Sequence, residues 1–258
     1  MSTPYDLWVF DMHDHPEDNF KRQEALGNMI VAEKPRSFVM GGDGSRHDAF
    51  STYDKYKQWT AAEEIAAWKN SLALMFGPLE EWNKRQASHR HKQHNMRTVL
   101  TLGNHEDRMW RALGEDPYGF GSLVDFDDIT GRKRYFDEVY AFGDVVNVNG
   151  IQCTHAPRNK MNRVMAHSTA AKQSNTHLIY GHTHTMQCTC TPIIGPENGS
   201  RMTLIAPAFM DEGQKEPYCQ NATTGWQYGF LKVYPSGSPT VPPGFEYIRT
   251  ERLLKEWL

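Results

Sequence analysis

The sequence predicts an α/β protein. Five short runs of apolar or β-branched residues are typical of buried strands, and a cluster of polar residues follows each run. A long stretch rich in Ala, Glu and Lys separates the second run from the third and is typical of helices. The five predicted strands are Leu7–Phe10, Ser37–Met40, Thr98–Leu102, Ile151–Thr154 and His177–Tyr180.

The stretch between the second and third strands predicts a helical hairpin over residues 53–96. Gly77-Pro78 interrupts it, so we expect one helix over Tyr53–Phe76 and another over Leu79–Asn95. Such a hairpin exceeds a simple crossover and would stand out from the domain as an insertion or cap. A further helix is expected over Lys160–Lys172.

The remaining segments predict more β-structure. Val145–Ile151 contains Asn149-Gly150, a turn sequence that closes β-hairpins. After His184, alternating apolar and polar residues predict a second sheet with Gly- and Pro-rich connections. Its expected strands are Gln187–Pro192, Arg201–Ala206 and Trp226–Val233.

The composition predicts one globular domain over residues 1–258. Hydrophobic residues make up 39% and charged residues 23%, and the formal charge of −3 gives no overall field toward nucleic acid or anionic lipid. No apolar run approaches the roughly 20 residues that a membrane helix needs, and no secretion signal begins the chain. We therefore expect a cytoplasmic protein without membrane contact, whose four cysteines are reduced thiols.

Candidate ligands follow all five predicted strands. Side chains from adjacent strand ends converge in open α/β sheets, and glycines let the backbone turn sharply beside a ligand. The clusters are Asp11-Met12-His13, Gly42-Asp43, Gly103-Asn104-His105-Glu106, His155 and Gly181-His182-Thr183-His184. In this order, D-x-H, G-D, G-N-H-E, H and G-H-x-H resemble the calcineurin-like metallophosphoesterase superfamily. The match spans Asp11 to His184. The segment Gly225–Phe230, together with G-N-H-E-D-R, also resembles exonuclease-like phosphoesterases of phages and bacteria.

The resemblance implies a four-layer αββα sandwich that holds two divalent metal ions. It places Asp11, His13 and His184 on the first metal, and Asn104, His155 and His182 on the second, with Asp43 bridging both. A shared carboxylate offsets the repulsion between two cations, while neutral imidazoles avoid an excess of negative charge. This mixed set of nitrogen and oxygen ligands suits Mn, Fe, Zn or Ni, and the resemblance favours Mn²⁺.

The expected reaction is phosphoester hydrolysis by a metal-activated hydroxide. His105 is placed by the family pattern as the general acid for the leaving oxygen. We expect a phosphodiesterase or nuclease that acts on nucleic acid or nucleotides. The alternatives are a phosphomonoesterase for small molecules or proteins, and a catalytically silent scaffold.

The pattern departs from the family at the residue that orients His105. Many members read G-D-x-x-D or G-D-x-x-N, whereas this chain has Arg46 in that place and Asp48 two positions later. The orienting partner of His105 is therefore open. His15 is an alternative to His13 as a ligand, and Glu106 is expected to be a first-turn carboxylate favoured by the helix dipole.

A basic segment lies in the second predicted helix of the hairpin. No acidic residue occurs from Asn83 to Asn104, and the segment could hold a polyanionic strand near the metals, with Trp59 or Trp82 available for base stacking. The candidate nucleic-acid contacts are Lys84, Arg85, Arg90 and Lys92. The alternative interpretation is a solvated helix face.

Overall fold

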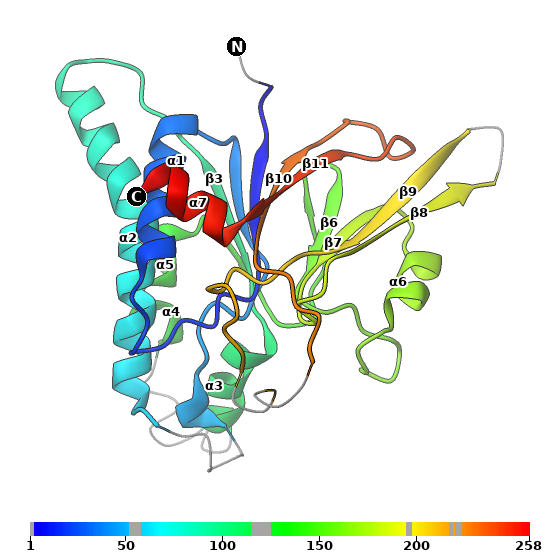
Figure 1. Ribbon diagram of the computed structural model, residues 1–258, viewed down its shortest axis with the longest axis horizontal. Coiled ribbons are helices and arrows are strands. Elements are labelled where there is room, and N and C mark those ends of the chain that lie inside the picture. Colours follow the sequence, from blue (N-terminus) through cyan, green and yellow to red (C-terminus); the bar gives the residue numbers. More distant parts are fainter. Residues whose placement is uncertain (1–2, 52–57, 115–124, 195–197, 217–218, 220–222) are drawn as a thin grey trace.

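A computed structural model describes residues 3–51, 58–114, 125–194, 198–216, 219 and 223–258, and shows a mixed α/β protein with two mixed sheets (Figure 1). The strands of the first sheet are β1 (Asp6–Val9), β2 (Ser37–Met40), β3 (Arg97–Thr101), β4 (Glu138–Tyr140), β10 (Gly229–Tyr234) and β11 (Gly244–Arg249). Those of the second are β5 (Val146–Val148), β6 (Ile151–Thr154), β7 (His177–Tyr180), β8 (Gln187–Ile193) and β9 (Gly199–Ile205). The strand orders are β11-β10-β1-β2-β3-β4 and β5-β6-β7-β9-β8.

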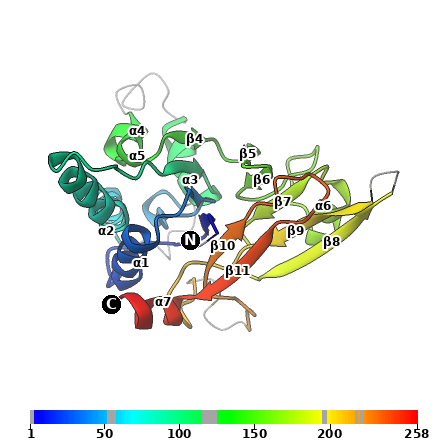
Figure 2. The ribbon, with the colours of Figure 1, turned by 90° about the horizontal axis from the view of Figure 1, so that it is seen from above.

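Helices connect and cover these strands. They are α1 (Lys21–Glu33), α2 (Ala61–Ser88), α3 (Asn104–Gly114), α4 (Phe126–Ile129), α5 (Arg132–Tyr135), α6 (His167–Gln173) and α7 (Thr250–Trp257), with one 3₁₀ turn, η1 (Asp48–Phe50). Helices α1, α2 and α7 lie on one side of the first sheet, and α6 lies beside the second sheet (Figures 1 and 2).

The buried apolar residues form separate cores because successive side chains of a strand point to opposite faces. Leu7 and Val9 of β1 pack into a core with helices α1, α2 and α7. Trp8, between them, packs into a core with residues of the second sheet such as Ile179. A small third cluster joins α6 to Tyr180 and its neighbours. One core thus joins the first sheet to helices α1, α2 and α7, and another contains residues of both sheets.

All five strands predicted from apolar runs are confirmed. Three have the predicted bounds, and β1 and β3 begin and end one residue earlier. The Asn149-Gly150 turn is also confirmed: both residues have positive φ, of 52° and 89°, and Val148 pairs with Ile151.

The expected membership of the second sheet is partly wrong. Strands β8 and β9 belong to it, together with β6 and β7, but β10 pairs with β1 in the first sheet. The reason is the packing of β10 on both faces: Phe230 enters the core with the helices, and Leu231 enters the core between the sheets. The alternation of apolar and polar residues along a strand does not reveal which sheet the strand joins when both of its faces are buried.

The predicted helical hairpin is wrong. A single helix, α2, runs from Ala61 to Ser88 through Gly77 and Pro78; residues 53–57 lie outside the described residues. Pro78 has no N–H to donate to the carbonyl of Leu74, four residues earlier, yet the helix continues because its apolar face packs on α1. Its start is fixed by a capping box between Thr60 and Glu63.

The predicted helix over residues 160–172 is shorter than expected. Helix α6 begins at His167, because backbone N–H groups of the preceding segment bond to a side chain and to a β-bridge partner and not to helical carbonyls. The side chain of Asn159 accepts from the N–H groups of Met161 and Arg163, and Arg158 forms a β-bridge with Val164.

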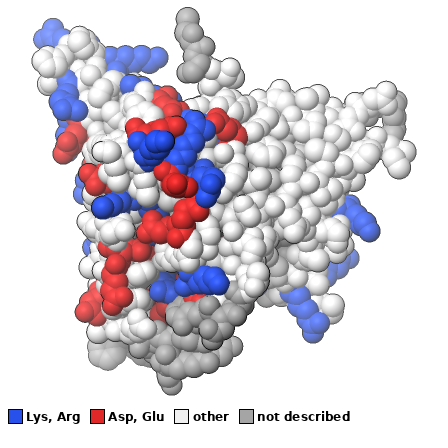
Figure 3. Space-filling view, in the orientation of Figure 1, with Lys and Arg blue, Asp and Glu red and all other residues white. Residues whose placement is uncertain are grey.

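The cysteines and the helices bear on the expected redox state and membrane contact of the chain. All four cysteines are free thiols. No helix among the described residues combines the length and apolar character needed to cross a membrane. On the face shown in Figure 3, basic and acidic side chains intermingle over the helical side, while the side of the second sheet carries few charges.

The close approach of α1 to α2 gives a prediction about Gly27. A Cβ at Gly27 would collide with the carbonyl oxygen of Leu74, whereas a Cβ at Gly77 would meet no atom within 4 Å. We expect Gly27→Ala to lower the free energy of unfolding by about 1–3 kcal/mol, and the matched Gly77→Ala to raise it by about 0.5–1 kcal/mol. Urea denaturation measures both, and equal effects of one sign would contradict the packing described here.

Candidate metal centre

The predicted ligands lie where strand ends of the two sheets meet. Some follow the parallel strands β1, β2 and β3, and the others follow the parallel strands β6 and β7. Parallel neighbours end at the same edge, so the structure brings the predicted ligands together. They are Asp11, His13, Asp43, His155 and His184, which are buried, and Asn104 and His182, which are half-buried.

Most of these residues have a left-handed backbone. Positive φ angles occur at Asp11 (50°), His13 (49°), Asp43 (50°), His182 (74°) and His184 (58°). Such conformations cost free energy in residues with a side chain and cluster at functional sites. Here they are held by a ladder of backbone hydrogen bonds, in which the N–H groups of Asp11 and His13 donate to the carbonyls of Gly42 and Asp43, each at 3.0 Å.

Glycines lie directly against the two carboxylates. A Cβ at Gly103 would collide with the carboxylate of Asp43, and a Cβ at Gly181 would collide with that of Asp11. The glycines of the G-N-H-E and G-H-x-H motifs therefore leave room for the acidic side chains. Their role here is close approach and does not depend on a special φ angle.

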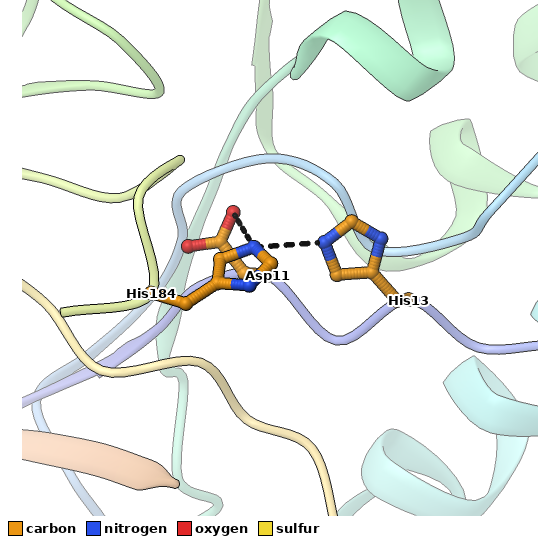
Figure 4. A group of neighbouring side chains, drawn as sticks. All are labelled: Asp11, His13 and His184. Atoms are coloured by element: carbon orange, nitrogen blue, oxygen red, sulfur yellow. Dashed lines mark hydrogen bonds and ion pairs between the residues drawn. The ribbon is translucent and has the colours of Figure 1, made fainter. Parts of the chain in front are cut away.

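Asp11, His13 and His184 form the first group of ligand atoms (Figure 4). The Nε2 atoms of His13 and His184 are 3.1 Å apart, and Nε2 of His184 lies 3.6 Å from Oδ1 of Asp11. Two ligands about 2.1 Å from one ion lie roughly 3 to 3.4 Å from each other. The spacing of these three atoms is therefore close to that of a metal site.

His155 is at the centre of the second group. Its Nε2 lies 3.2 Å from Oδ2 of Asp43 and 3.1 Å from Oδ1 of Asn104, and His182 is the remaining member. Its Nδ1 lies 3.0 Å from the carbonyl oxygen of Gly41, to which an Nδ1–H donates. In the neutral ring, Nε2 then presents a lone pair to two oxygen acceptors, and a cation between these atoms satisfies all of them.

The electrostatic environment indicates which groups carry charge. Burial would raise the pKa of Asp43, but His155 and His105 hold that pKa well below its ordinary value. Burial works against a charged His155, yet Asp43 and Asp11 raise its pKa to about 9. Burial and the neighbouring imidazoles lower the pKa of His13 well below its ordinary value. Without a metal, His155 thus carries the proton that balances Asp43, and a cation can replace it.

His105 lies beside this centre at the start of α3. Its backbone N–H donates to Oδ1 of Asp43 at 2.9 Å, and its Nε2 lies 3.9 Å from Oδ2 of the same carboxylate. Its Nδ1 lies 2.6 Å from the main-chain carbonyl oxygen of Arg46, and Nη2 of Arg108 lies 3.1 Å from its Nε2. The orienting partner left open by the sequence is therefore a carbonyl group, which every residue type supplies. Asp48 instead pairs with Arg108 at 3.1 Å.

Glu106 has a larger structural role than the sequence suggested. It lies in the first turn of α3, as expected, but it is buried and its carboxylate accepts from the N–H groups of Gly103 (2.7 Å), Asp43 (3.0 Å) and Gly44 (2.7 Å). It thereby fixes the loop that carries Asp43 against the loop that carries His105. Burial and the adjacent Asp43 raise the pKa of Glu106.

Two sets of candidate residues lie apart from these groups. His15 belongs to no potential metal-binding group of the described residues; its ring stacks on Trp59 at a centroid distance of 5.0 Å. The basic segment is not one helix, because α2 ends at Ser88. The chain after α2 leads to the start of β3, whereas the site lies beyond the ends of the parallel strands (Figure 1). In this connection, Nε2 of His94 lies 2.8 Å from the carbonyl oxygen of Pro35, just before β2. Lys84 and Arg85 belong to α2, whereas Arg90 and Lys92 follow it.

Comparison with known proteins adds no family assignment: no family model matches the chain, and a search of curated proteins gives no match. The described residues of the site form groups of buried His and Asp side chains that could hold a metal ion.

The role of Glu106 can be tested by removing its carboxylate. We expect Glu106→Ala to lower the free energy of unfolding by about 2–4 kcal/mol, because each buried N–H left without an acceptor costs about 1–3 kcal/mol. Asp107→Ala is the matched control: its partner is Arg111 on the helix surface, and its loss should cost less than about 0.5 kcal/mol. Equal losses in chemical denaturation would show that Glu106 does not organise the loops.

Proposed function

We propose that this protein is a dinuclear, metal-dependent phosphoester hydrolase of the calcineurin-like kind, acting as a phosphodiesterase or nuclease on nucleic acid or nucleotides. One observation carries the proposal: ligand atoms from five strand ends, most of them buried, form three potential metal-binding groups that share Asp43 or His13. Asp43 lies in one group with His155 and His182, and in another with His13 and His105.

The layering of the chain supports the same proposal. The packing of both sheets against each other, with α1, α2 and α7 outside one and α6 outside the other, fits a four-layer αββα sandwich. In that arrangement the strand ends of the two sheets face one site from either side. Each sheet thereby contributes ligands to the same centre.

The ligand set favours two transition-metal ions, and we propose Mn²⁺, with Fe, Zn or Ni as alternatives. Imidazole nitrogens predominate, while the carboxylates of Asp11 and Asp43 and the amide oxygen of Asn104 complete the set. Bound there, two such ions would lower the pKa of water and offset negative charge on the phosphoryl oxygens. Asp43, which lies in the second group with His155 and in another with His13 of the first group, would offset positive charge at both positions.

His105 and Arg108 supply the remaining chemistry. In the doubly protonated ring, Nδ1–H of His105 donates to the carbonyl of Arg46, and Nε2–H, which faces the cluster, would be given to the leaving oxygen. The guanidinium of Arg108, whose Nη2 lies 3.1 Å from this Nε2, would bind a phosphoryl oxygen in place of this contact, because two N–H donors do not bond each other.

An aromatic surface beside the first group supports a nucleotide substrate. The half-buried Trp226 packs edge-to-face against His184, with ring centroids 4.3 Å apart. The N–H of Gln227 donates to the carbonyl of His184 and fixes this segment beside the ligand. We propose that a base next to the scissile phosphate stacks on Trp226. Contact through Lys84, Arg85, Arg90 and Lys92 is not needed for this and stays a separate prediction.

The reaction is tested with bis(p-nitrophenyl) phosphate and the p-nitrophenyl monoester in the presence of Mn²⁺. We expect the diester to be hydrolysed faster, and His105→Ala to lower kcat by about 10²–10⁴-fold with unchanged metal content. His89→Ala, which removes an exposed histidine beyond α2, is the control and should keep full activity.

Three results would contradict the proposal in different ways. Turnover of the monoester alone would indicate a phosphomonoesterase. Metal binding without turnover of either ester would indicate a scaffold. Unchanged kcat in both His105→Ala and Asp43→Ala would overturn the proposed mechanism.

The stacking surface gives a separate prediction. We expect Trp226→Ala to raise KM for a short single-stranded oligonucleotide about 5- to 100-fold, since stacking on an aromatic ring contributes about 1–3 kcal/mol per base. Trp257→Ala, in α7, is the matched control and should leave KM unchanged. Steady-state kinetics on both variants decide the point, and an equal KM for Trp226→Ala and wild type would remove the stacking role.

A further inference from the structure

A buried carboxylate outside every motif of the sequence contacts the ligand His13. Glu216 is 1% exposed, and its Oε1 lies 3.5 Å from Nδ1 of His13, which is also 1% exposed. Neither of these two atoms makes a hydrogen bond to any other described residue. A short movement of either side chain would therefore satisfy both.

The opposite nitrogen of His13 determines what Nδ1 must do. Its Nε2 points at Nε2 of His184, 3.1 Å away, within the first group of ligand atoms. A neutral imidazole carries one proton, so an Nε2 that binds a metal requires the proton on Nδ1. Glu216 is positioned to accept that proton in a hydrogen bond.

The second oxygen of Glu216 is held by Arg46. Oε2 lies 3.4 Å from Nε and 3.3 Å from Nη2 of the guanidinium, whose side chain is 7% exposed. Arg46 offsets the charge of the buried carboxylate, so Glu216 adds no net charge to the cluster. The main-chain carbonyl of the same Arg46 orients His105.

We propose that Glu216 is a positioning residue that fixes the tautomer and orientation of His13 for metal binding and, through Arg46, ties this ligand to the loop that orients His105. The inference rests on the proposed metal centre. Carboxylates that accept from metal-binding imidazoles raise the basicity of the ligand, and their loss costs about 10- to 100-fold in metal affinity.

The first experiment measures the affinity for Mn²⁺ by electron paramagnetic resonance titration. We expect Glu216→Gln to weaken one of the two Mn²⁺ sites about 10- to 100-fold and to leave the other within about threefold. Glu216→Asp keeps the charge beside Arg46 but withdraws the carboxylate from His13, so its affinity should also fall. Glu212→Gln, which removes an exposed carboxylate of the same segment paired with Arg249, should bind Mn²⁺ like wild type.

The second experiment needs neither a metal nor a variant that folds. Nitrogen-15 NMR of the imidazoles in metal-free wild type should report the Nδ1–H tautomer for His13, and where Glu216→Gln folds, its spectrum should lose that preference. A wild-type His13 protonated on Nε2, or a Glu216→Gln variant with unchanged Mn²⁺ affinity, would overturn the inference. A wild type that binds no Mn²⁺ would refute the proposed metal centre, while the tautomer of His13 would still test the contact with Glu216.

Discussion

Asp43 is a buried carboxylate, and it stays charged there because neighbouring imidazoles and a backbone N–H stabilise its negative charge. Its side chain accepts the backbone N–H of His105 and faces the ring of His155, so the loops of both sheets converge on it. Its backbone joins two further segments, because its N–H donates to Glu106 and its carbonyl accepts from His13. The site depends on this one residue because every element that carries a ligand is fixed to it or to a residue bonded to it.

The strained loops around Asp43 persist because the surrounding structure compensates for them. Left-handed residues such as Asp11 and His184 are individually unfavourable, and a flexible loop would relax them. Backbone hydrogen bonds from Asp11 and His13 to the loop of Asp43 oppose this relaxation. Glu106 fixes the loop of Asp43 by accepting its backbone N–H groups, and Gly103 lets the carboxylate of Asp43 lie against the main chain. The ligand atoms are therefore arranged before any ion arrives, which lowers the cost of ordering them on binding.

The sequence predicted those parts of the molecule that depend on local signals. Buried strands such as Ser37–Met40 appear in the sequence as apolar runs. The candidate ligands come directly after these runs, because polar side chains can lie at the end of a strand but not in the apolar core. The break at Gly77-Pro78 was predicted and is absent, since packing on α1 outweighs the hydrogen bond that Pro78 cannot make. The capping pair Thr60 and Glu63 was present in the sequence as a signal for the true start of α2.

Glu216 shows why the outer part of the site was not predictable. Its chemistry depends on a contact with His13, some two hundred residues earlier, and no spacing or motif near residue 216 signals it. Charge gives a physical reason for its pairing with Arg46: without that partner, Glu216 would add a third buried negative charge beside Asp11 and Asp43. In the proposed hydrolase, two divalent ions over these two carboxylates would leave an excess of roughly two positive charges, which would attract an anionic phosphodiester. Because Arg46 offsets its charge, the proposed positioning of His13 by Glu216 would not weaken that attraction.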